Sequence, residues 1–127
     1  GTSVIFDYQL LFKGSKTGSY LTIEKKKGAS VPVAVWEVSE RDEQRLDAYE
    51  GYPNFYYKTD MSLTVKGFFN GRKKKVDAFV YIMHEERELG IPSSAYVRTC
   101  VAGYRHFGFD LKHLRLAMDI SERGEIV

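Results

Sequence analysis

Glu50 is the residue whose type and position best suit acid–base chemistry. Ser39 followed by Asp42 predicts a helix start, close to a capping box with Asp in the place of Glu. Gly51 followed by Pro53 predicts the end of that helix, so that Glu50 is its last residue. The negative end of the helix dipole and apolar neighbours would both disfavour a charged carboxylate there. Both effects would raise the pKa of Glu50 towards neutrality, where one carboxyl can take and return a proton.

Position alone leaves another interpretation of Glu50 open, a solvated glutamate at a helix end, because perturbed carboxyls are rare. Three tyrosines are candidate site residues together with Glu50. Tyr57 lies in the strand expected after the helix, Tyr81 in the strand expected to pair with the Tyr57 strand, and Tyr96 at the start of a later helix. A single tyrosine in a core or at an interface usually needs only a partner for its hydroxyl. The tyrosines by themselves therefore do not define a site.

The composition is that of a globular protein. The 127 residues fit one domain, and 43% of them are hydrophobic and 14% aromatic. Nineteen basic against seventeen acidic side chains leave a net charge of +2, which does not indicate nucleic acid or an acidic membrane as a partner. The single cysteine excludes an internal disulfide, and no apolar run approaches the roughly 20 residues of a membrane span. We therefore expect a cytoplasmic protein.

The pattern along the chain alternates strands and helices, and it predicts an α+β fold. The expected elements are strands at residues 3–12, 20–24, 31–38, 55–65 and 75–83, one helix at 39–50, a second from 92–94 to about 107, and a last helix capped by Asp110 with Leu111, Leu114 and Met118 on its inner face. The expected connections are a loop at 14–18, a basic turn at 25–28, a hairpin at Asn70-Gly71 and a polar loop at 85–90, and the tail from residue 121 is expected either to fray or to make an edge contact.

Two features refine this prediction. The apolar run at residues 31–38 is typical of a strand buried on both faces. Long hairpin-connected strands with segregated helices favour a small mixed, strongly curved sheet or barrel, with one inserted helix and two C-terminal helices. Because there are no repeats or linkers, we expect a single domain over residues 1–127.

A block around Glu50 reads Leu46-Asp47-Ala48-Tyr49-Glu50-Gly51-Tyr52, with Tyr57-Lys58 shortly after. This block resembles the signature of the gamma-glutamylcyclotransferase-like (AIG2-like) family, and residues 6–12, 20–23 and 31–38 fall in the family's order. The resemblance implies that Glu50 is the catalytic acid/base and that Tyr57, Tyr81 and Tyr96 line the pocket and help to hold the substrate. It implies a cyclising aminolysis of a small γ-glutamyl compound to 5-oxoproline and a free amine, without a metal or other cofactor.

The beginning of the sequence departs from the family pattern. Members begin with a strand and a Tyr-Gly-Ser-Asn-type loop whose backbone amides cradle the glutamyl end of the substrate, whereas this sequence starts at Gly1-Thr2-Ser3. We therefore expect an N-terminally incomplete domain with an unpaired sheet edge that could support a homodimer. A second hypothesis follows, in which the chain is a non-catalytic small-ligand-binding or interaction domain of the same fold.

Other residues give weaker signals. The histidines at 84, 106 and 113 lack metal-ligand spacing, and Cys100 on an apolar helix stripe is typical of a core residue. The basic runs at 25–27 and 72–75 do not interleave with aromatic residues, so nucleic-acid binding remains a third hypothesis, one that requires steeply salt-dependent affinity. The sequence contains neither a glycine-rich phosphate loop nor a Gly-x-Ser-x-Gly elbow.

Overall fold

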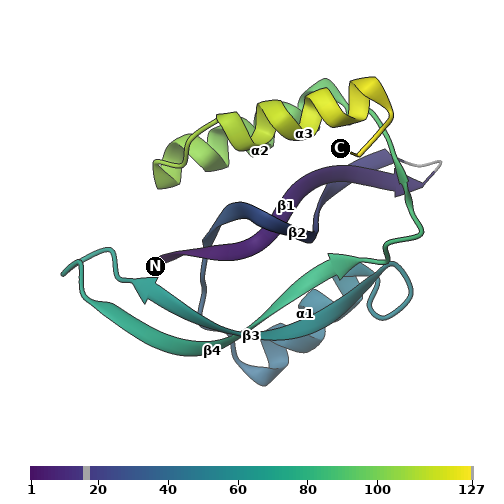
Figure 1. Cartoon of the computed structure of the whole chain (residues 1–127). Helices are drawn as coiled ribbons and strands as arrows, with labels where there is room; N and C mark the ends of the chain where they lie inside the picture. The colour runs from purple at the N-terminus through teal and green to yellow at the C-terminus, as the bar shows by residue number, and fades with distance from the viewer. Residues whose placement is uncertain (16–17, 127) are drawn as a thin grey trace. The chain divides into compact units, whose positions relative to one another are not determined.

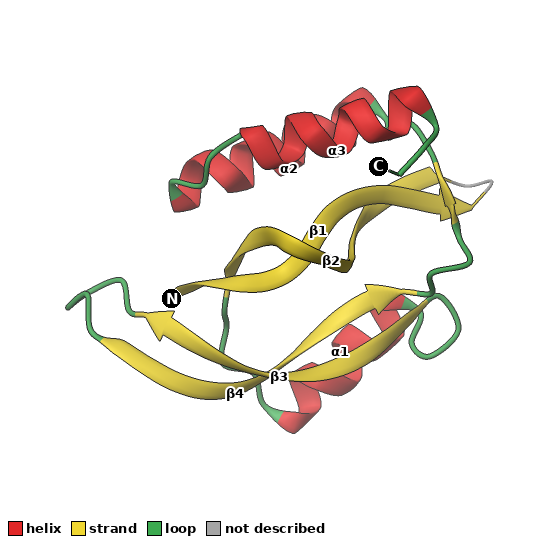
Figure 2. Ribbon diagram, in the orientation of Figure 1, coloured by secondary structure: helices red, strands yellow, loops and turns green. Residues whose placement is uncertain are grey.

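The computed structural model describes residues 1–15 and 18–126 (Figure 1). The elements in chain order are β1 (Thr2–Ser15), β2 (Gly18–Ala34), α1 (Glu40–Glu50), β3 (Tyr56–Lys66), β4 (Lys73–Met83), β5 (Glu88–Leu89), α2 (Ser94–Phe107) and α3 (Lys112–Arg123). The long strands are hydrogen-bonded neighbours in the order β2-β1-β3-β4, and β5 pairs with β1. Helix α1 is inserted among the strands and α2 and α3 follow them, which confirms the predicted α+β class (Figure 2).

The chain forms two compact units. The first consists of Gly1–Ile5 and Pro32–His84, and so contains the start of β1, the end of β2, helix α1 and the β3–β4 hairpin. The second consists of Phe6–Val31 and Glu85–Val127, and so contains the rest of β1 and β2 together with β5, α2 and α3. The single domain over residues 1–127 stays a prediction.

The first unit is built on the antiparallel β3–β4 hairpin. Its register runs from Tyr56 opposite Met83 to Lys66 opposite Lys73, and the start of β1 joins it where Thr2 lies opposite Lys66. The predicted hairpin is confirmed, but Asn70-Gly71 lies within a longer loop at 67–72 rather than forming a two-residue turn. Gly71 has a φ of 64°, and the Arg72 amide donates to the Asn70 side-chain oxygen at 2.9 Å.

The second unit packs apolar residues from its strands and helices. Leu11 and Phe12 of β1 are 0% and 1% exposed, and Ala117 of α3 is 0% exposed. Helix α2 starts after the N-cap Ser93 and ends before the left-handed Gly108, which confirms both predicted ends. The side chains of α3 that the structure shows as buried are Leu114, Ala117, Ile120 and Ser121.

The N-terminal strands differ from the prediction. Strand β2 runs without interruption through residues 25–28, so the predicted basic turn there is wrong. Asp7 has a φ of 61° and its carboxylate accepts a hydrogen bond from the Gly28 amide at 2.9 Å. This contact across the strand pair accommodates the irregular backbone within the strand. The predicted loop at 14–18 is too long, because β1 extends to Ser15 and β2 already begins at Gly18. Residues 16–17 lie outside the described residues.

The predicted strand at 31–38 is also wrong in its extent. Strand β2 ends at Ala34, and the following residues 35–39 form no strand. Val31 is buried, but Trp36 is 71% exposed, so this run is not covered on both faces. Apolar composition alone does not show where a strand loses its hydrogen-bonding neighbour.

Three predictions near the C-terminus need correction. The expected loop at 85–90 contains β5, which pairs Leu89 with Lys13 of β1. The N-cap of α3 is Leu111 rather than Asp110, although the Asp110 carboxylate accepts a hydrogen bond from the Lys112 amide at 2.8 Å. The helix continues to Arg123, so the tail does not fray at residue 121, and Val127 lies outside the described residues.

Of the expected inner face of α3, Leu114 is buried, while Leu111 and Met118 are only half-buried. None of the helices within residues 1–15 and 18–126 has the length and apolar character needed to cross a membrane.

Candidate active site

Local sequence signals set the two ends of α1. The Ser39 hydroxyl accepts a hydrogen bond from the Asp42 amide at 3.1 Å, and the Asp42 carboxylate accepts one from the Ser39 amide at 3.4 Å, which confirms the predicted capping box. At the other end Gly51 is left-handed, with φ 68° and ψ 35°. The Tyr52 amide then donates to the Asp47 carbonyl oxygen at 2.9 Å, which closes the last turn. Glu50 is therefore the last residue of α1, as predicted.

The Glu50 side chain is half-buried at this helix end. Burial raises the pKa of its carboxyl above the ordinary value. This is the direction expected from the sequence, and a raised pKa brings a carboxyl closer to the range in which it can exchange protons near neutral pH.

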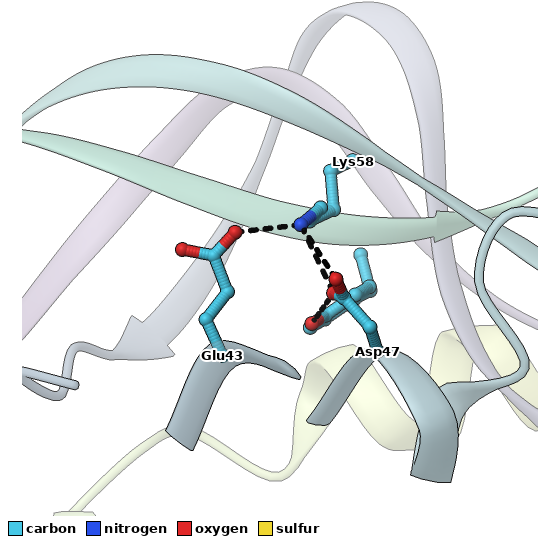
Figure 3. Close-up of polar contacts among 4 residues, drawn as sticks. Glu43, Asp47 and Lys58 are labelled. Carbon is cyan, nitrogen blue, oxygen red and sulfur yellow. Dashed lines mark hydrogen bonds and ion pairs between the residues drawn. The ribbon is translucent and has the colours of Figure 1, made fainter. Parts of the chain in front are cut away.

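Glu50 shares one face of α1 with two other acidic residues. Glu43, Asp47 and Glu50 are spaced by four and three residues, which aligns their side chains on one side of a helix. Figure 3 shows the Lys58 ammonium of β3 lying between Glu43 and Asp47. Its Nζ is 2.6 Å from Glu43 Oε2 and 2.9 Å from Asp47 Oδ1.

Strand pairing brings a tyrosine to the same carboxylate. Lys58 of β3 lies opposite Tyr81 of β4, so both side chains project from the same face of the hairpin. The Tyr81 hydroxyl donates to Asp47 Oδ1 at 2.5 Å. We call Glu43, Asp47, Lys58 and Tyr81 the Lys58 cluster. It joins α1 to both strands of the hairpin.

The pKa values of residues in the Lys58 cluster are shifted mainly by their contacts with one another and by burial, whereas that of Glu50 is shifted by burial alone. The hydrogen bond from Tyr81, and then that from Lys58, lower the pKa of Asp47. Hydrogen bonds to Glu43 and Asp47 raise the pKa of Lys58, and burial followed by the Asp47 carboxylate raises that of Tyr81. Asp47 therefore holds its negative charge at neutral pH, whereas Glu50, one turn further along the helix, has a raised pKa.

The hairpin separates Tyr57 from Tyr81. Tyr57 lies opposite Ile82 and is one position away from Lys58, so its side chain projects from the other face of the hairpin. Its ring centre is 5.2 Å from that of His84, whose Nε2 lies 2.6 Å from the Pro53 carbonyl oxygen. The neighbouring residue Tyr56 projects from the same face as Lys58.

Tyr96 belongs to the second unit, in the first turn of α2. Its hydroxyl accepts a hydrogen bond from the Leu21 amide of β2 at 3.0 Å. Its ring packs edge-on against Tyr20 and Phe12, with centroid distances of 5.2 and 6.4 Å. These contacts give Tyr96 a structural role within its unit, and a pocket of Tyr57, Tyr81 and Tyr96 around Glu50 stays a prediction.

Comparison with known proteins identifies the family. Residues 1–98 match the family model described as "Gamma-glutamyl cyclotransferase, AIG2-like". The chain belongs to this family. The matched residues include Glu50 and the whole Lys58 cluster, and they end within α2, before α3 begins. The resemblance seen in the sequence is thereby confirmed.

Solved structures support the gamma-glutamyl cyclotransferase fold. One titled "Gamma-glutamyl cyclotransferase" has a TM-score of 0.74 and 22% identity, and the match covers 91% of this chain and 70% of that one. A human protein described as uncharacterized has a TM-score of 0.73, with the same 22% identity and coverage of 91% and 70%. No curated protein matches the chain.

Three members of the Lys58 cluster, namely Glu43, Asp47 and Lys58, had no role predicted from the sequence. The spacing of Glu43, Asp47 and Glu50 was a visible signal for an acidic helix face. The partner Lys58 could not be read from the sequence, because the packing of a helix on a strand depends on tertiary structure. In the described part of the chain, no group of three or more His, Cys, Asp or Glu residues could hold a metal ion.

Proposed function

We propose that this chain is a gamma-glutamyl cyclotransferase with Glu50 as its general acid/base. Its substrate would be a γ-glutamyl amino acid or amine, which it converts to 5-oxoproline and a free amine. The observation that carries the proposal is the half-buried Glu50 carboxyl, whose pKa burial raises, inside the residues that match the family. Such a carboxyl suits a reaction in which one group must first accept a proton and then donate it.

The proposed reaction begins with the substrate's α-ammonium group. Glu50 removes a proton from it, and the freed amine attacks the γ-carbonyl carbon of the same molecule. A carbon–nitrogen bond forms within the new five-membered ring, and the bond from that carbon to the leaving nitrogen breaks. Glu50 returns its proton to this nitrogen, and the ring nitrogen releases its remaining surplus proton to the solvent, so that the products are 5-oxoproline and a neutral amine. General acid–base catalysis of this kind contributes about 10²–10⁴-fold.

The carboxylate of Asp47 is less suited to this role. Its hydrogen bonds to Tyr81 and Lys58 lower its pKa, so that it stays charged and is a weak base at neutral pH. We assign to Asp47 and Lys58 the task of holding α1, and with it Glu50, against the hairpin. Tyr57, Tyr81 and Tyr96 are proposed to hold the flexible glutamyl chain in its cyclising conformation, which lowers the entropic part of the barrier.

The test measures release of 5-oxoproline from γ-glutamyl amino acids, γ-glutamyl amines and glutathione. We expect the unchanged chain to act on at least one of them, and Glu50→Gln to lower kcat by about 10²-fold or more because the proton carrier is lost. Glu86→Gln is the matched control, because it removes the same group from an exposed position. Circular dichroism would check that both variants fold.

Two results would overturn this assignment. Turnover by Glu50→Gln equal to that of Glu86→Gln would remove Glu50 from the chemistry. Saturable calorimetric binding of γ-glutamyl ligands without any product would favour the non-catalytic ligand-binding domain. The small γ-glutamyl substrate and a homodimer are the partners we propose, and sedimentation of the chain at several concentrations would test the dimer.

A further inference from the structure

A hollow in the second unit lies between α3 and the strands β1 and β2 and has no part in the proposed reaction. Its volume is about 320 Å³ and its lining includes Lys26 of β2 and Lys112, His113, Leu116 and Arg123 of α3. We call this hollow the α3 groove. Helix α3 lies outside the residues that match the family model, whereas the β1 and β2 residues of the lining lie within them.

The lining of the α3 groove has one sign of charge. Lys26, Lys112 and Arg123 are cationic, and none of the lining residues in the described part of the chain is acidic. Basic and acidic residues are nearly balanced over the whole sequence, nineteen against seventeen, so this lining is a local excess of positive charge. Burial, and then the neighbouring Lys112, lower the pKa of His113, which leaves the lysines and the arginine as the charges at neutral pH.

Two of these cations lack the partners that other cations in this protein have. Lys13 pairs with Glu24, and Lys58 with Glu43 and Asp47. Lys112 and Arg123 form no ion pair with any residue in the ranges 1–15 and 18–126. The nearby Asp110 carboxylate accepts a hydrogen bond from the Lys112 backbone amide and is attracted by the Lys112 charge, but the two side chains form no close ion pair. Unpaired like charges around one hollow favour an anion from outside the chain.

The groove also offers an apolar surface between these cations. Leu116 is 56% exposed, whereas Ile120, one turn further along α3, is 7% exposed. With Lys112 and Arg123 they occupy one face of the helix, beside the buried stripe that contains Leu114. An exposed leucine flanked by two cations suits a ligand that has an anionic end and an apolar body.

We propose that the α3 groove binds a small organic anion with an apolar body. Lys112 at the start of α3, or Arg123 at its end, would hold its carboxylate or phosphate group, and Leu116 and Ile120, which lie between them on the helix, would contact its alkyl or aryl part. The volume of about 320 Å³ is at the lower end of the range for small-molecule sites, about 300–1,000 Å³. The residues that line this site include neither Glu50 nor any of the three tyrosines proposed to hold the substrate.

The test uses four probes with the same alkyl chain: octanoate, octyl phosphate, octanol and octylamine. Calorimetric titration should show that at least one of the anions binds tighter than octanol by about tenfold or more, since a charge-assisted contact adds to the apolar one. Octylamine should not bind measurably. The ratio between octanoate and octyl phosphate identifies which anionic group the site prefers.

Substitutions locate the binding. Lys112→Gln combined with Arg123→Gln should lower the affinity for the preferred anion at least tenfold and leave the affinity for octanol unchanged. Leu116→Ser should lower the affinity for the anion and for octanol by the same factor. The matched control is Lys73→Gln combined with Lys74→Gln, which removes two exposed cations of β4 in the other unit and should change nothing. All five positions are exposed, and thermal unfolding would check that the variants stay folded.

Three outcomes would overturn the proposal. Equal affinity for octanol and both anions would show that the cations take no part. Equal losses of anion affinity in the Lys112/Arg123 and Lys73/Lys74 variants would show that the anion is attracted non-specifically by the positive charge of the protein. Anion-induced changes in amide NMR signals confined to residues outside α3, β1 and β2 would place the binding elsewhere.

Discussion

Helices α1 and α3 both carry charged residues along one face but are held in different ways. None of the residues Glu40–Glu50 of α1, all of which the structure describes, is buried, and the helix joins its hairpin through the Lys58 cluster. Helix α3 has a buried stripe that includes Leu114 and Ala117. The charges of α1 are therefore used in holding the helix, whereas the apolar packing of α3 leaves its cations available to a ligand.

The largest expected effect is a loss of stability, and it tests whether apolar packing holds α3 more strongly than it holds α1. Leu114→Ala should lower the free energy of unfolding by about 2–5 kcal/mol, because Leu114 is 6% exposed and its loss leaves a cavity. Leu46→Ala in α1 should cost clearly less, about 1 kcal/mol, since Leu46 is only half-buried. Urea unfolding of the two variants measures both values. Equal losses would contradict the view that the helices are held differently.

The next prediction tests whether the polar contacts of Lys58 hold α1. Lys58→Met leaves Glu43 and Asp47 without their common cation, so the last turn of α1 should loosen. Misplacement of Glu50 should then lower kcat by about 10–10²-fold with a smaller change in KM. Lys58→Arg keeps the charge and should restore most of the loss. Lys74→Met, at an exposed position of β4, is the matched control and should be neutral.

A second measurement makes this prediction independent of turnover. Hydrogen exchange at the amides that close the last turn of α1, those of Gly51 and Tyr52, should be faster in Lys58→Met than in the unchanged chain. Unchanged exchange would show that Lys58 does not hold the helix. Faster exchange together with unchanged kcat would show that the position of α1 does not govern the chemistry.

What the sequence could predict of the fold was largely local. The capping box at Ser39, the left-handed Gly51 and the ends of α2 at Ser93 and Gly108 depend on residues a few positions apart, and all were predicted correctly. The error at residues 25–28 had a distant cause. There, Gly28 donates to Asp7 on the neighbouring strand, and a run of lysines followed by glycine gives no sign of that contact.

The candidate site shows the same division. The position of Glu50 at a helix end followed from its own neighbours, and the family signature lay within the same short block. The Lys58 cluster requires both the β3–β4 register and the packing of α1 on that hairpin, so the contacts among its members could not be predicted from the sequence. The opposite faces of Tyr57 and Tyr81 likewise depend on a register that only the structure gives.

The smallest expected effect concerns the two carboxyls of α1, whose pKa values shift in opposite directions. Burial raises the pKa of Glu50 above its ordinary value of 4.5, so its contribution to stability is complete below that pH and is lost as the pH rises through the folded-state pKa. The hydrogen bond from Tyr81 lowers the pKa of Asp47 below 3.8. Its contribution is complete above that pH and is lost as the pH falls through the folded-state pKa.

Removing each charge should therefore change stability with opposite sign near neutral pH. Glu50→Gln should unfold at a higher urea concentration than the unchanged chain, because no buried charge has to form, and this gain should shrink as the pH falls through the folded-state pKa towards 4.5 and be absent below it. Asp47→Asn should unfold at a lower concentration, and its deficit should shrink below pH 3.8. Exposed Asp60→Asn is the control. Shifts of the same sign in both variants would mean that the two carboxyls have similar surroundings, and the distinction between a structural Asp47 and a catalytic Glu50 would lose its physical basis.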